Sequence, residues 1–582
     1  LATALIGTAD TTYFQQRADY RIEARLDEGA QVLDGRLRMR YHNNAPAALD
    51  TLWFHLHLNA FRPDSRWARR ELEFNERRFQ NLGPDSHAFE RVSRVVVNGT
   101  AVTPVYPLAP DSTVMGVPLP RSLAAGDSLA VDMDWTARPS TLPRRQARRG
   151  RHFDFAQWYP RIAVYDRGGW QVQPLLPQGE FYGEFGSFDV TLDLAADQVM
   201  GATGVPVEGD PGWAGAAAVP GTVPDLRRDA YPAMAAETLG LLEGSAAEGR
   251  RRVRWRAGDV HHFAWTTTPD YIYEGGRYGD VAIHVLYRPG DDDWAGGVAV
   301  RRTAAALAAF DTIFGAFPWP QLTNVHRIEG GGTEFPMMVM NGSASDGLIL
   351  HEVGHNYVHG ILANNEWREG WLDEGFVSYL TNWAHQLAGR PVNWVPSYAA
   401  IAQLDREGSQ PIGLASADYA DPGMYGAMTY TKPSIVFRML HWLMGDDAFR
   451  AALRDYYADN RLQHVTEADL RRAVNAHAEE PMDWFFDQWI HTTATMDYRI
   501  GAIGTTRRAD GQWVTRVEVI RDGETWMPVD LQVGSLVQRL ASREPRQVVE
   551  VVSAAPPAEA VLDPDGVLLD TDPSNNRRPV TR

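Results

Sequence analysis

Alternation of apolar and polar residues marks the first and last parts of the chain. Successive side chains of a β-strand point to opposite faces, so this pattern predicts strands with one buried face. Gly, Pro and Asp-Gly pairs separate the alternating runs and predict turns between them. We expect strands at 20–26, 37–41, 188–192, 515–520, 548–552 and 567–569.

The middle of the chain has a helical period instead. Apolar residues recur there every three to four positions, which indicates amphipathic helices. Besides two helices on either side of a polar turn at 363–370, the pattern predicts helices at 299–314, 433–445, 448–460 and 467–478.

A chain of 582 residues is too long for one hydrophobic core, and roughly three or four domains are typical of this length. The order of the patterns predicts a multidomain α+β protein. We place an N-terminal β domain at 1–268, a mostly helical domain at 269–494 and a small C-terminal β domain at 495–582.

One motif carries most of the chemical information. Residues 351–355 read His-Glu-Val-Gly-His, and residues i and i+4 of a helix lie on one face. His351 and His355 can therefore present two imidazoles to one metal ion, and zinc accepts such ligands. Glu352 lies on the same turn, where it is placed to take a proton from a water molecule.

Glu374 follows the second histidine in the segment Trp371-Leu372-Asp373-Glu374-Gly375. The turn at 363–370 would bring a second helix back toward the first, with Glu374 in its first turn. A catalytic zinc needs three protein ligands and an open position. The sequence therefore predicts one zinc ion per chain, held by His351, His355 and Glu374.

Three other interpretations concern the same residues. The metzincin pattern needs Gly at 358 and His at 361, where this chain has Val358 and Ile361. His359 could act as a further ligand, but a polar residue near the helix end is the favoured interpretation. Two ordinary amphipathic helices with hydrogen-bonded histidines are the remaining alternative.

The amino-acid composition argues against several classes of function and of metal site. The net charge of −18 argues for solubility and against nucleic acid as the main partner. The chain has no cysteine, so metal must be bound by histidine and carboxylate. The chain contains no run of eighteen apolar residues, so no transmembrane helix is predicted.

The chain starts Leu1-Ala2-Thr3, which suggests N-terminal trimming and a periplasmic or secreted location.

One cluster of like charge stands out in this acidic chain, and we interpret it as a solvated loop between strands rather than an anion-binding surface. It consists of Arg144, Arg145, Arg148, Arg149 and Arg151.

With the metal segments placed, the chain resembles the M1 family of zinc aminopeptidases, which are gluzincins. Residues 371–376 resemble the family's second zinc segment, and Gly331-Gly332-Thr333-Glu334-Phe335-Pro336 resembles its Gly-x-Met-Glu-Asn strand. Tyr430-Thr431-Lys432-Pro433 resembles its Tyr-x-Lys-Gly segment, and residues 156–160 resemble its Thr-Gln-Phe-Glu-Pro segment. The resemblance implies a saddle-like N-terminal β domain, a thermolysin-like catalytic domain and a C-terminal β-sandwich.

The resemblance also implies roles. Tyr430 would donate its phenolic proton to the oxyanion, with Tyr425 as a second candidate. Glu334 would bind the free α-ammonium of a peptide substrate. Gln157, Gly331 and Gly332 would line the substrate site.

This sequence departs from the family's pattern at three positions. Thr333 and Phe335 replace the Met and Asn of the strand motif, and Tyr159 stands where a second ammonium-binding Glu is expected. The ammonium anchor would then rest on Glu334 alone or use another acid, such as Glu180 or Glu184.

The resulting hypothesis is a zinc-dependent aminopeptidase that removes the N-terminal residue of peptides with a free N-terminus. One alternative is an M1-like zinc hydrolase that cleaves internal peptide bonds or an epoxide. The other is a non-catalytic M1-like binding protein, which would be expected to have lost Glu352 or a ligand; all of these residues are present.

Overall fold

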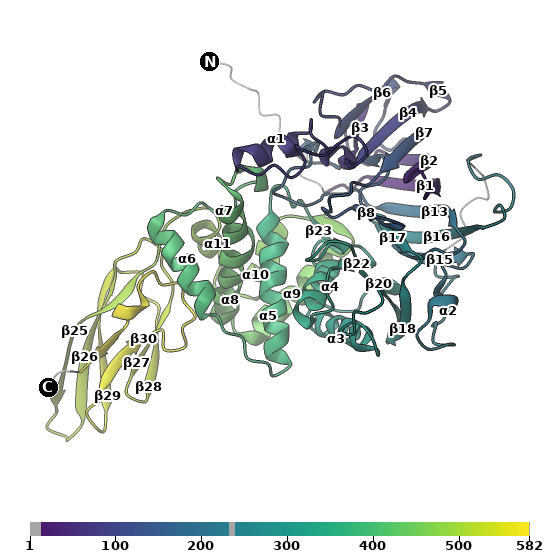
Figure 1. Cartoon of the computed structure of the whole chain (residues 1–582). Coiled ribbons are helices and arrows are strands. Elements are labelled where there is room, and N and C mark those ends of the chain that lie inside the picture. The colour runs from purple at the N-terminus through teal and green to yellow at the C-terminus, as the bar shows by residue number, and fades with distance from the viewer. Residues whose placement is uncertain (1–12, 232–238, 581–582) are drawn as a thin grey trace, which may run out of the picture. The chain divides into compact units, whose positions relative to one another are not determined.

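The computed structural model describes residues 13–231 and 239–580, and its contacts divide the chain into two compact units (Figure 1). Residues up to 367 and 457–465 form the first unit, and residues 368–456 and 466 onward form the second. The predicted multidomain α+β class is confirmed: a β-rich N-terminal part, a helical middle region and a C-terminal β-sandwich follow one another. The boundaries at 268/269 and 494/495 stay predictions. The start of the chain, on which the predicted trimming depends, lies outside the described residues.

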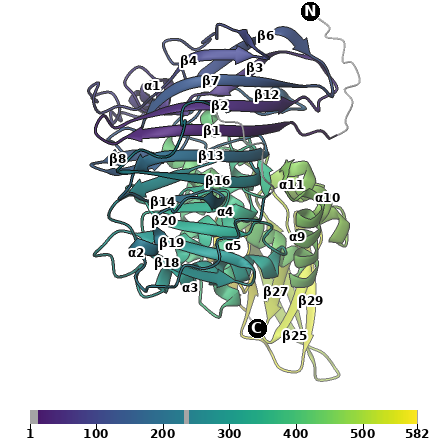
Figure 2. The ribbon, with the colours of Figure 1, turned by 90° about the vertical axis from the view of Figure 1, so that its right-hand side faces the viewer.

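A mixed eight-stranded sheet dominates the first unit, and its central strands run side by side in Figure 2. Strand β7 alternates strictly between buried and half-buried positions, which confirms that the period-two pattern marks strands with one buried face. In spatial order the strands are β15 (Val205–Glu208), β16 (Arg250–Val260), β13 (Gly186–Ala195), β1 (Arg17–Asp27), β2 (Val32–His42), β7 (Ser128–Arg138), β4 (Phe89–Val97) and β5 (Thr100–Ala101).

Smaller elements complete the β-rich part of this unit. They are the strands β3 (Leu49–His55), β6 (Val114–Leu123), β8 (Ala147–Arg149), β9 (His152–Phe155), β10 (Arg161–Ile162), β11 (Tyr165–Asp166), β12 (Gly169–Trp170), β14 (Val199–Ala202) and β17 (Trp265–Thr268), and the helices α1 (Arg66–Glu73) and α2 (Trp213–Ala216).

A five-stranded sheet lies in the region that the sequence marked as mostly helical. The alternating pattern does not reveal it, because its central strands are buried on both faces: β19 reads as a nearly continuous apolar run, and β20 buries polar and apolar residues alike. The strands are, in spatial order, β18 (Ile272–Tyr278), β19 (Val281–Tyr287), β20 (Gln321–His326), β22 (Met338–Asn341) and β21 (Glu334–Phe335).

Helices α3 (Val298–Ile313) and α4 (Asp346–Tyr357) accompany this sheet. The Tyr357 ring at the end of α4 contacts Phe310, Phe314 and Phe317, which anchors α4 on an aromatic cluster. The predicted turn at 363–370 is partly a strand: β23 (Leu362–Asn364) pairs in parallel with β24 (Gln463–Val465).

The helices predicted in the later part of the chain are present within a few residues of their expected bounds: α5 (Glu374–Leu387), α8 (Lys432–Met444), α9 (Asp446–Asn460) and α10 (Glu467–His477). The second unit also contains three helices that the sequence pattern did not predict, α6 (Val395–Glu407), α7 (Pro422–Gly426) and α11 (Asp483–Trp489). No helix among the described residues is both long and apolar enough to span a bilayer.

Two sheets at the C-terminal end of this unit form the sandwich (Figure 1). One contains β25 (Tyr498–Arg507), β26 (Trp513–Arg521) and β29 (Arg546–Ser553). The other contains β28 (Leu536–Leu540), β27 (Val529–Val533), β30 (Glu559–Leu562) and β31 (Arg577–Pro579).

Two further expectations from the sequence are wrong. Residues 567–569 are not a strand, because the carboxylate of Asp563 accepts the N–H groups of Val567 and Leu568 at 3.0 and 2.9 Å and holds them in a turn. The arginine cluster is not simply a solvated loop: Arg145 and Arg148 are each only 5% exposed, and both are hydrogen-bonded.

Candidate active site

Helix α4 carries the His-Glu-x-x-His motif, as the sequence predicts. Ser345 is the N-cap residue, and Asp346 in the first turn lies where a carboxylate stabilises the helix dipole. Ile349 and Val353 are fully buried and fix which face of the helix turns inward. The helix ends at Tyr357, because Val358 has an extended backbone.

The two histidines of α4 converge. Nε2 of His351 and Nε2 of His355 lie 3.0 Å apart, and the rings are nearly perpendicular. Zinc–imidazole bonds of 2.0–2.1 Å at a tetrahedral angle put two ligand nitrogens about 3.3 Å apart. The spacing and chemistry of this pair therefore fit a zinc ion.

Glu352 is 4% exposed and lies directly against Gly332. A β-carbon built on Gly332 would overlap the Glu352 carboxylate, so only glycine leaves this space open. The predicted general base and a predicted substrate-site glycine are thus neighbours in the first unit.

Arg327 holds the glycine-rich segment in place. Its guanidinium donates to the carbonyl of Gly330 at 2.6 Å and to the hydroxyl of Thr333. Burial lowers the pKa of Arg327, while the nearby carboxylates of Glu329 and Glu352 favour its charged form. The carbonyl of Gly331 also accepts the N–H of Gly342 at 2.7 Å. The segment is therefore fixed by backbone and side-chain bonds together.

Glu334 lies on β21, which is the edge strand of the five-stranded sheet, as predicted. Asn356 of α4 ties the helix to this region: its Oδ1 accepts the N–H of Met337 at 2.8 Å. Because Asn356 follows His355 directly, this bond links the histidine helix to the strand segment that carries Glu334.

Two further buried carboxylates gather with Glu334. One oxygen each of Glu180, Glu334 and Glu366 lies within 4.8 Å of the other two, and the residues are 7%, 4% and 1% exposed. Arg145 forms an ion pair with Glu180, and its guanidinium lies over the Phe181 ring. Three close carboxylates in a buried place favour a bound cation.

The structure separates the two alternative acids named from the sequence. Glu180 belongs to this cluster, whereas the carboxylate of Glu184 lies 3.1 Å from Nε2 of His464. Tyr159 packs its ring against Tyr20 and Trp158 and is nearly fully buried. Gln157 is buried with a backbone φ of +56°, and its assignment to substrate binding stays a prediction.

His359 lies two residues beyond the end of α4, as the favoured interpretation has it. It is buried with φ at +99°, and its Nδ1 lies 2.8 Å from Oε1 of Glu366. Its carbonyl lies 3.0 Å from Nε2 of His261. Sequence reasoning missed Glu366, because a glutamate in the polar segment 363–370 gives no local signal of burial.

In the second unit Glu374 is the first residue of α5, as predicted, and it meets Tyr430. The Tyr430 hydroxyl donates to Oε1 of Glu374 at 2.5 Å. Stacking of Phe376 on Phe437 at 4.3 Å packs α5 against α8 and thereby holds the two residues together.

Gly375 allows this approach. A β-carbon at Gly375 would lie 2.6 Å from Cβ of Pro433 and 2.9 Å from the carbonyl oxygen of Thr429. Tyr430 itself lies in a single π-helical turn at 427–431, a feature that is frequent at functional sites. The Tyr425 ring lies edge-on to Tyr430 at 6.2 Å, so the second tyrosine candidate belongs to the same group.

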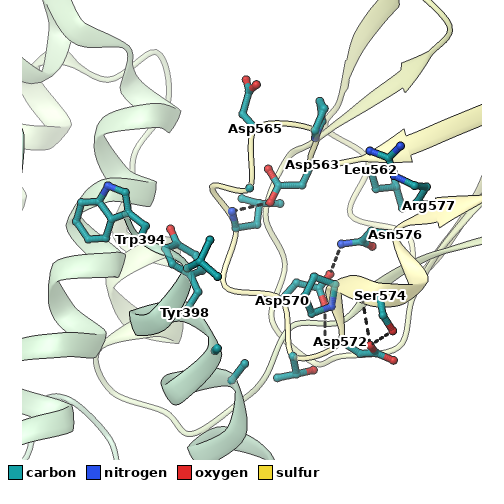
Figure 3. Close-up of a pocket in the computed structure, with 18 of the residues that line it drawn as sticks. Trp394, Tyr398, Leu562, Asp563, Asp565, Asp570, Asp572, Ser574, Asn576 and Arg577 are labelled. Carbon is teal, nitrogen blue, oxygen red and sulfur yellow. Dashed lines mark hydrogen bonds between the residues drawn. The ribbon is translucent and has the colours of Figure 1, made fainter. Parts of the chain in front are cut away.

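The second unit also contains a cavity of about 750 Å³ between α6 and the 561–577 segment (Figure 3). Its carboxylates stabilise turns: Asp570 accepts from Asn576 at 3.0 Å, and Asp572 accepts from the N–H of Ser574. None of the predicted site residues lines this cavity.

Comparison with known families gives a direct match. Residues 339–489 match the peptidase family M1 domain. Membrane alanyl aminopeptidase of Heliothis virescens is 26% identical over 137 residues, which are 22% of this chain and 14% of that protein. Aminopeptidase N of Lactobacillus helveticus is 26% identical over 153 residues, 25% of this chain and 18% of that protein. The matched parts thus span less than a fifth of these two relatives.

Solved structures share the fold over a greater length. An M1 zinc metallopeptidase from Deinococcus radiodurans matches with a TM-score of 0.54 and 16% identity over 81% of this chain and 92% of that one. Legionella pneumophila aminopeptidase A, in complex with aspartic acid, matches with a TM-score of 0.61 and 11% identity over 95% of this chain and 59% of that one. The resemblance drawn from the sequence motifs is confirmed.

Proposed function

We propose that this chain, which carries a peptidase family M1 domain, is a zinc metallo-aminopeptidase that releases the N-terminal residue of peptides with a free α-amine. The proposal rests chiefly on the converging His351 and His355 nitrogens, with Glu352 on the same helical turn, inside the matched domain.

One zinc ion per chain would be held by His351, His355 and Glu374. The 3.0 Å spacing of the histidine nitrogens supports the first two ligands. The position of Glu374 at the start of α5 and its match to the family's second zinc segment support the third. The bound ion would supply a Lewis acid that polarises the scissile carbonyl and acidifies water.

The side chains of this protein would move the protons. Glu352 accepts a proton from the attacking water and returns it to the leaving amine, which is the task of a positioned general base and acid. Tyr430 donates a hydrogen bond to the oxyanion as it forms.

The carboxylate cluster would bind the substrate's α-ammonium. Glu334 and Glu180 are the acids assigned to this role, so Glu180 would stand in for the second acid that Tyr159 replaces. Their burial favours the pairing because an ammonium ion compensates a carboxylate more strongly where water is scarce. An internal peptide bond offers no ammonium there, which would make the enzyme an exopeptidase.

A panel of L-aminoacyl p-nitroanilides, each with and without an N-acetyl group, tests the activity. We expect hydrolysis of the free-amine compounds only, loss of activity with a chelator, and recovery with added zinc. Equal hydrolysis of acetylated compounds would favour an endopeptidase. Absence of hydrolysis for every compound and for internal peptides would favour an epoxide hydrolase or a binding protein.

Metal analysis tests the ligand set. We expect about one equivalent of zinc in the wild type and a clear loss in Glu374→Ala. Glu407→Ala, which removes an exposed acid in the same unit, is the matched control and should keep its zinc. Full zinc occupancy in Glu374→Ala would exclude Glu374 as a ligand.

An extracytoplasmic location also stays a prediction, which fractionation of the source cells would test.

A further inference from the structure

Lysine is almost absent from this protein. The chain contains 56 basic Lys and Arg residues, and Lys432 is the only lysine among them. Every other position that needs a fixed positive charge has arginine. Lys432 is thus the one side chain of the sequence that presents a compact ammonium instead of a planar guanidinium.

Lys432 is also one of the most buried cations in the second unit. Its side chain is 2% exposed, and Nζ lies 2.7 Å from Oδ1 of Asp405, whose side chain is 3% exposed. Asp405 belongs to α6, and Lys432 is the first residue of α8. The same carboxylate oxygen accepts the hydroxyl of Ser409 at 2.6 Å. The ion pair therefore joins the start of α8 to α6.

The Lys432–Asp405 ion pair matters because Lys432 lies at the start of α8, next to the turn that carries Tyr430. Lys432 directly follows the π-helical turn at 427–431, and Tyr430 is the fourth residue of that turn. A π-turn is rarer and less favourable than continued α-helix, so it persists only where surrounding contacts hold it. Pro433 packed against Gly375 is one such contact, and the Lys432–Asp405 pair is another.

Arginine would not serve at this position. A guanidinium has five N–H donors in a rigid plane, whereas an ammonium has three on a single atom. In a place that is 2% exposed, the larger planar group would need extra acceptors and extra volume. Its accommodation would shift the start of α8 and with it the turn that carries Tyr430.

We infer that Lys432, through its ion pair with Asp405, is a positioning residue that holds the π-turn and so keeps the Tyr430 hydroxyl on Glu374. This inference rests on the proposed function for its catalytic consequence, since the hydroxyl matters only if it meets the oxyanion. Lys432 itself touches neither substrate nor reacting atoms in this assignment. Its loss should therefore act on turnover and leave substrate binding largely intact.

A double-mutant cycle separates positioning from a general effect on stability. Lys432→Arg should lower kcat at least tenfold with KM within about twofold of wild type. In a Tyr430→Phe background the same change should lower kcat less than twofold, because the hydroxyl that it misplaces is already absent. An equal loss in both backgrounds would overturn the inference.

A second variant, in which both members of the ion pair are replaced, tests the inference if Lys432→Arg does not fold. Lys432→Met combined with Asp405→Asn removes both charges and leaves no unpaired buried ion. It should show the same dependence on Tyr430. Arg438→Met, on the same helix α8, is the control; it loses the bonds to Tyr398 and Gly566 and should keep kcat even if its melting temperature falls.

A second readout does not depend on enzymatic activity. With 3-fluorotyrosine placed at position 430, the wild type should give one ¹⁹F resonance that differs from that of free fluorotyrosine. Lys432→Arg and the paired variant should move it toward the free value or broaden it, and Arg438→Met should not. An unchanged resonance in both would overturn the inference, whereas an inactive wild type with the expected resonances would count only against the proposed function.

Discussion

Gly332 and Glu352 are in such close contact that position 332 has no room for a β-carbon beside the carboxylate. Gly332→Ala should therefore displace the general base. Since the backbone of Gly332 is not in the left-handed region, alanine should not strain the chain, and the melting temperature should stay near wild type. We expect kcat to fall at least tenfold, the low end of the contribution of a positioned base.

Gly330→Ala is the matched control, because a β-carbon at 330 meets no atom within 4 Å. Steady-state kinetics of both variants check this prediction. Normal turnover in Gly332→Ala would show that Glu352 does not need its present position.

Glu352→Gln keeps the size of the side chain and removes the proton acceptor. We expect kcat to fall by about a hundredfold or more. Zinc content should be unchanged, since Glu352 is not assigned as a ligand. Metal analysis and kinetics on one preparation check both parts, and near-normal turnover would exclude Glu352 as the base.

Tyr430→Phe removes one hydroxyl and its bond to Glu374. The expected cost is about 3 kcal/mol in the transition state, the scale of one oxyanion donor. The loss should appear in kcat more than in KM because the charge develops only during reaction. Tyr425→Phe serves as the comparison: a severe loss there with a mild loss at 430 would reverse the assignment of the two tyrosines.

Glu334→Ala should depress kcat/KM for free-amine substrates by about 1.5–3 kcal/mol or more, the usual cost of a lost charged hydrogen-bond partner. Glu180→Gln should act in the same direction if it shares the ammonium. The measured quantity is the ratio of kcat/KM for a free and an acetylated version of the same peptide. The Glu184→Gln variant is the control, because Glu184 pairs with His464 instead. A ratio that no variant changes would remove the amine-binding role from the cluster.

Glu369 should make stability depend on pH. Burial raises the pKa of this carboxyl from 4.5 to about 7, although the Glu467 N–H that it accepts opposes the shift. The folded state then holds the proton more tightly than the unfolded state. This contribution is fully present below pH 4.5 and is lost as pH rises through 7.

Glu369→Gln should therefore raise the melting temperature at pH 8 by a few degrees, with a gain of about 1–3 kcal/mol at most. At pH 4 the two proteins should melt at similar temperatures. Thermal unfolding across this pH range, with Glu407→Gln as an exposed control, checks the sign. A Glu369→Gln variant that is less stable at pH 8 would contradict it.

The features that the sequence predicted well are those with a local signal. The i, i+4 spacing of His351 and His355, the amphipathic stripe of α4 and the start of α5 at Glu374 all depend on residues close in the chain. Glu334 was placed on a strand through the resemblance of residues 331–336 to the family's strand motif, and it lies on β21. The strands in the first and last parts of the chain were found because their residues alternate between a buried and a more exposed face.

The features that it missed depend on distant partners. Nothing near Arg145 in the chain shows that it will be buried against Glu180, and nothing near Glu366 shows that its carboxylate will lie against the His359 ring. The turn at Val567 formed where the apolar run favoured a strand, because the carboxylate of Asp563 competed for its N–H. Packing between separate segments decides the burial of Arg145, whereas at Val567 a local side-chain bond overrides the strand propensity.

The single buried lysine has a practical consequence for handling this protein. Reagents that attach to side-chain amines, such as succinimidyl esters and aldehyde cross-linkers, need an accessible lysine, and the side chain of Lys432 is 2% exposed. Fluorophores or surfaces coupled through side-chain amines would therefore have no accessible target while the fold is intact. Gradual labelling at 432 on heating would instead report the opening of the helix that starts there.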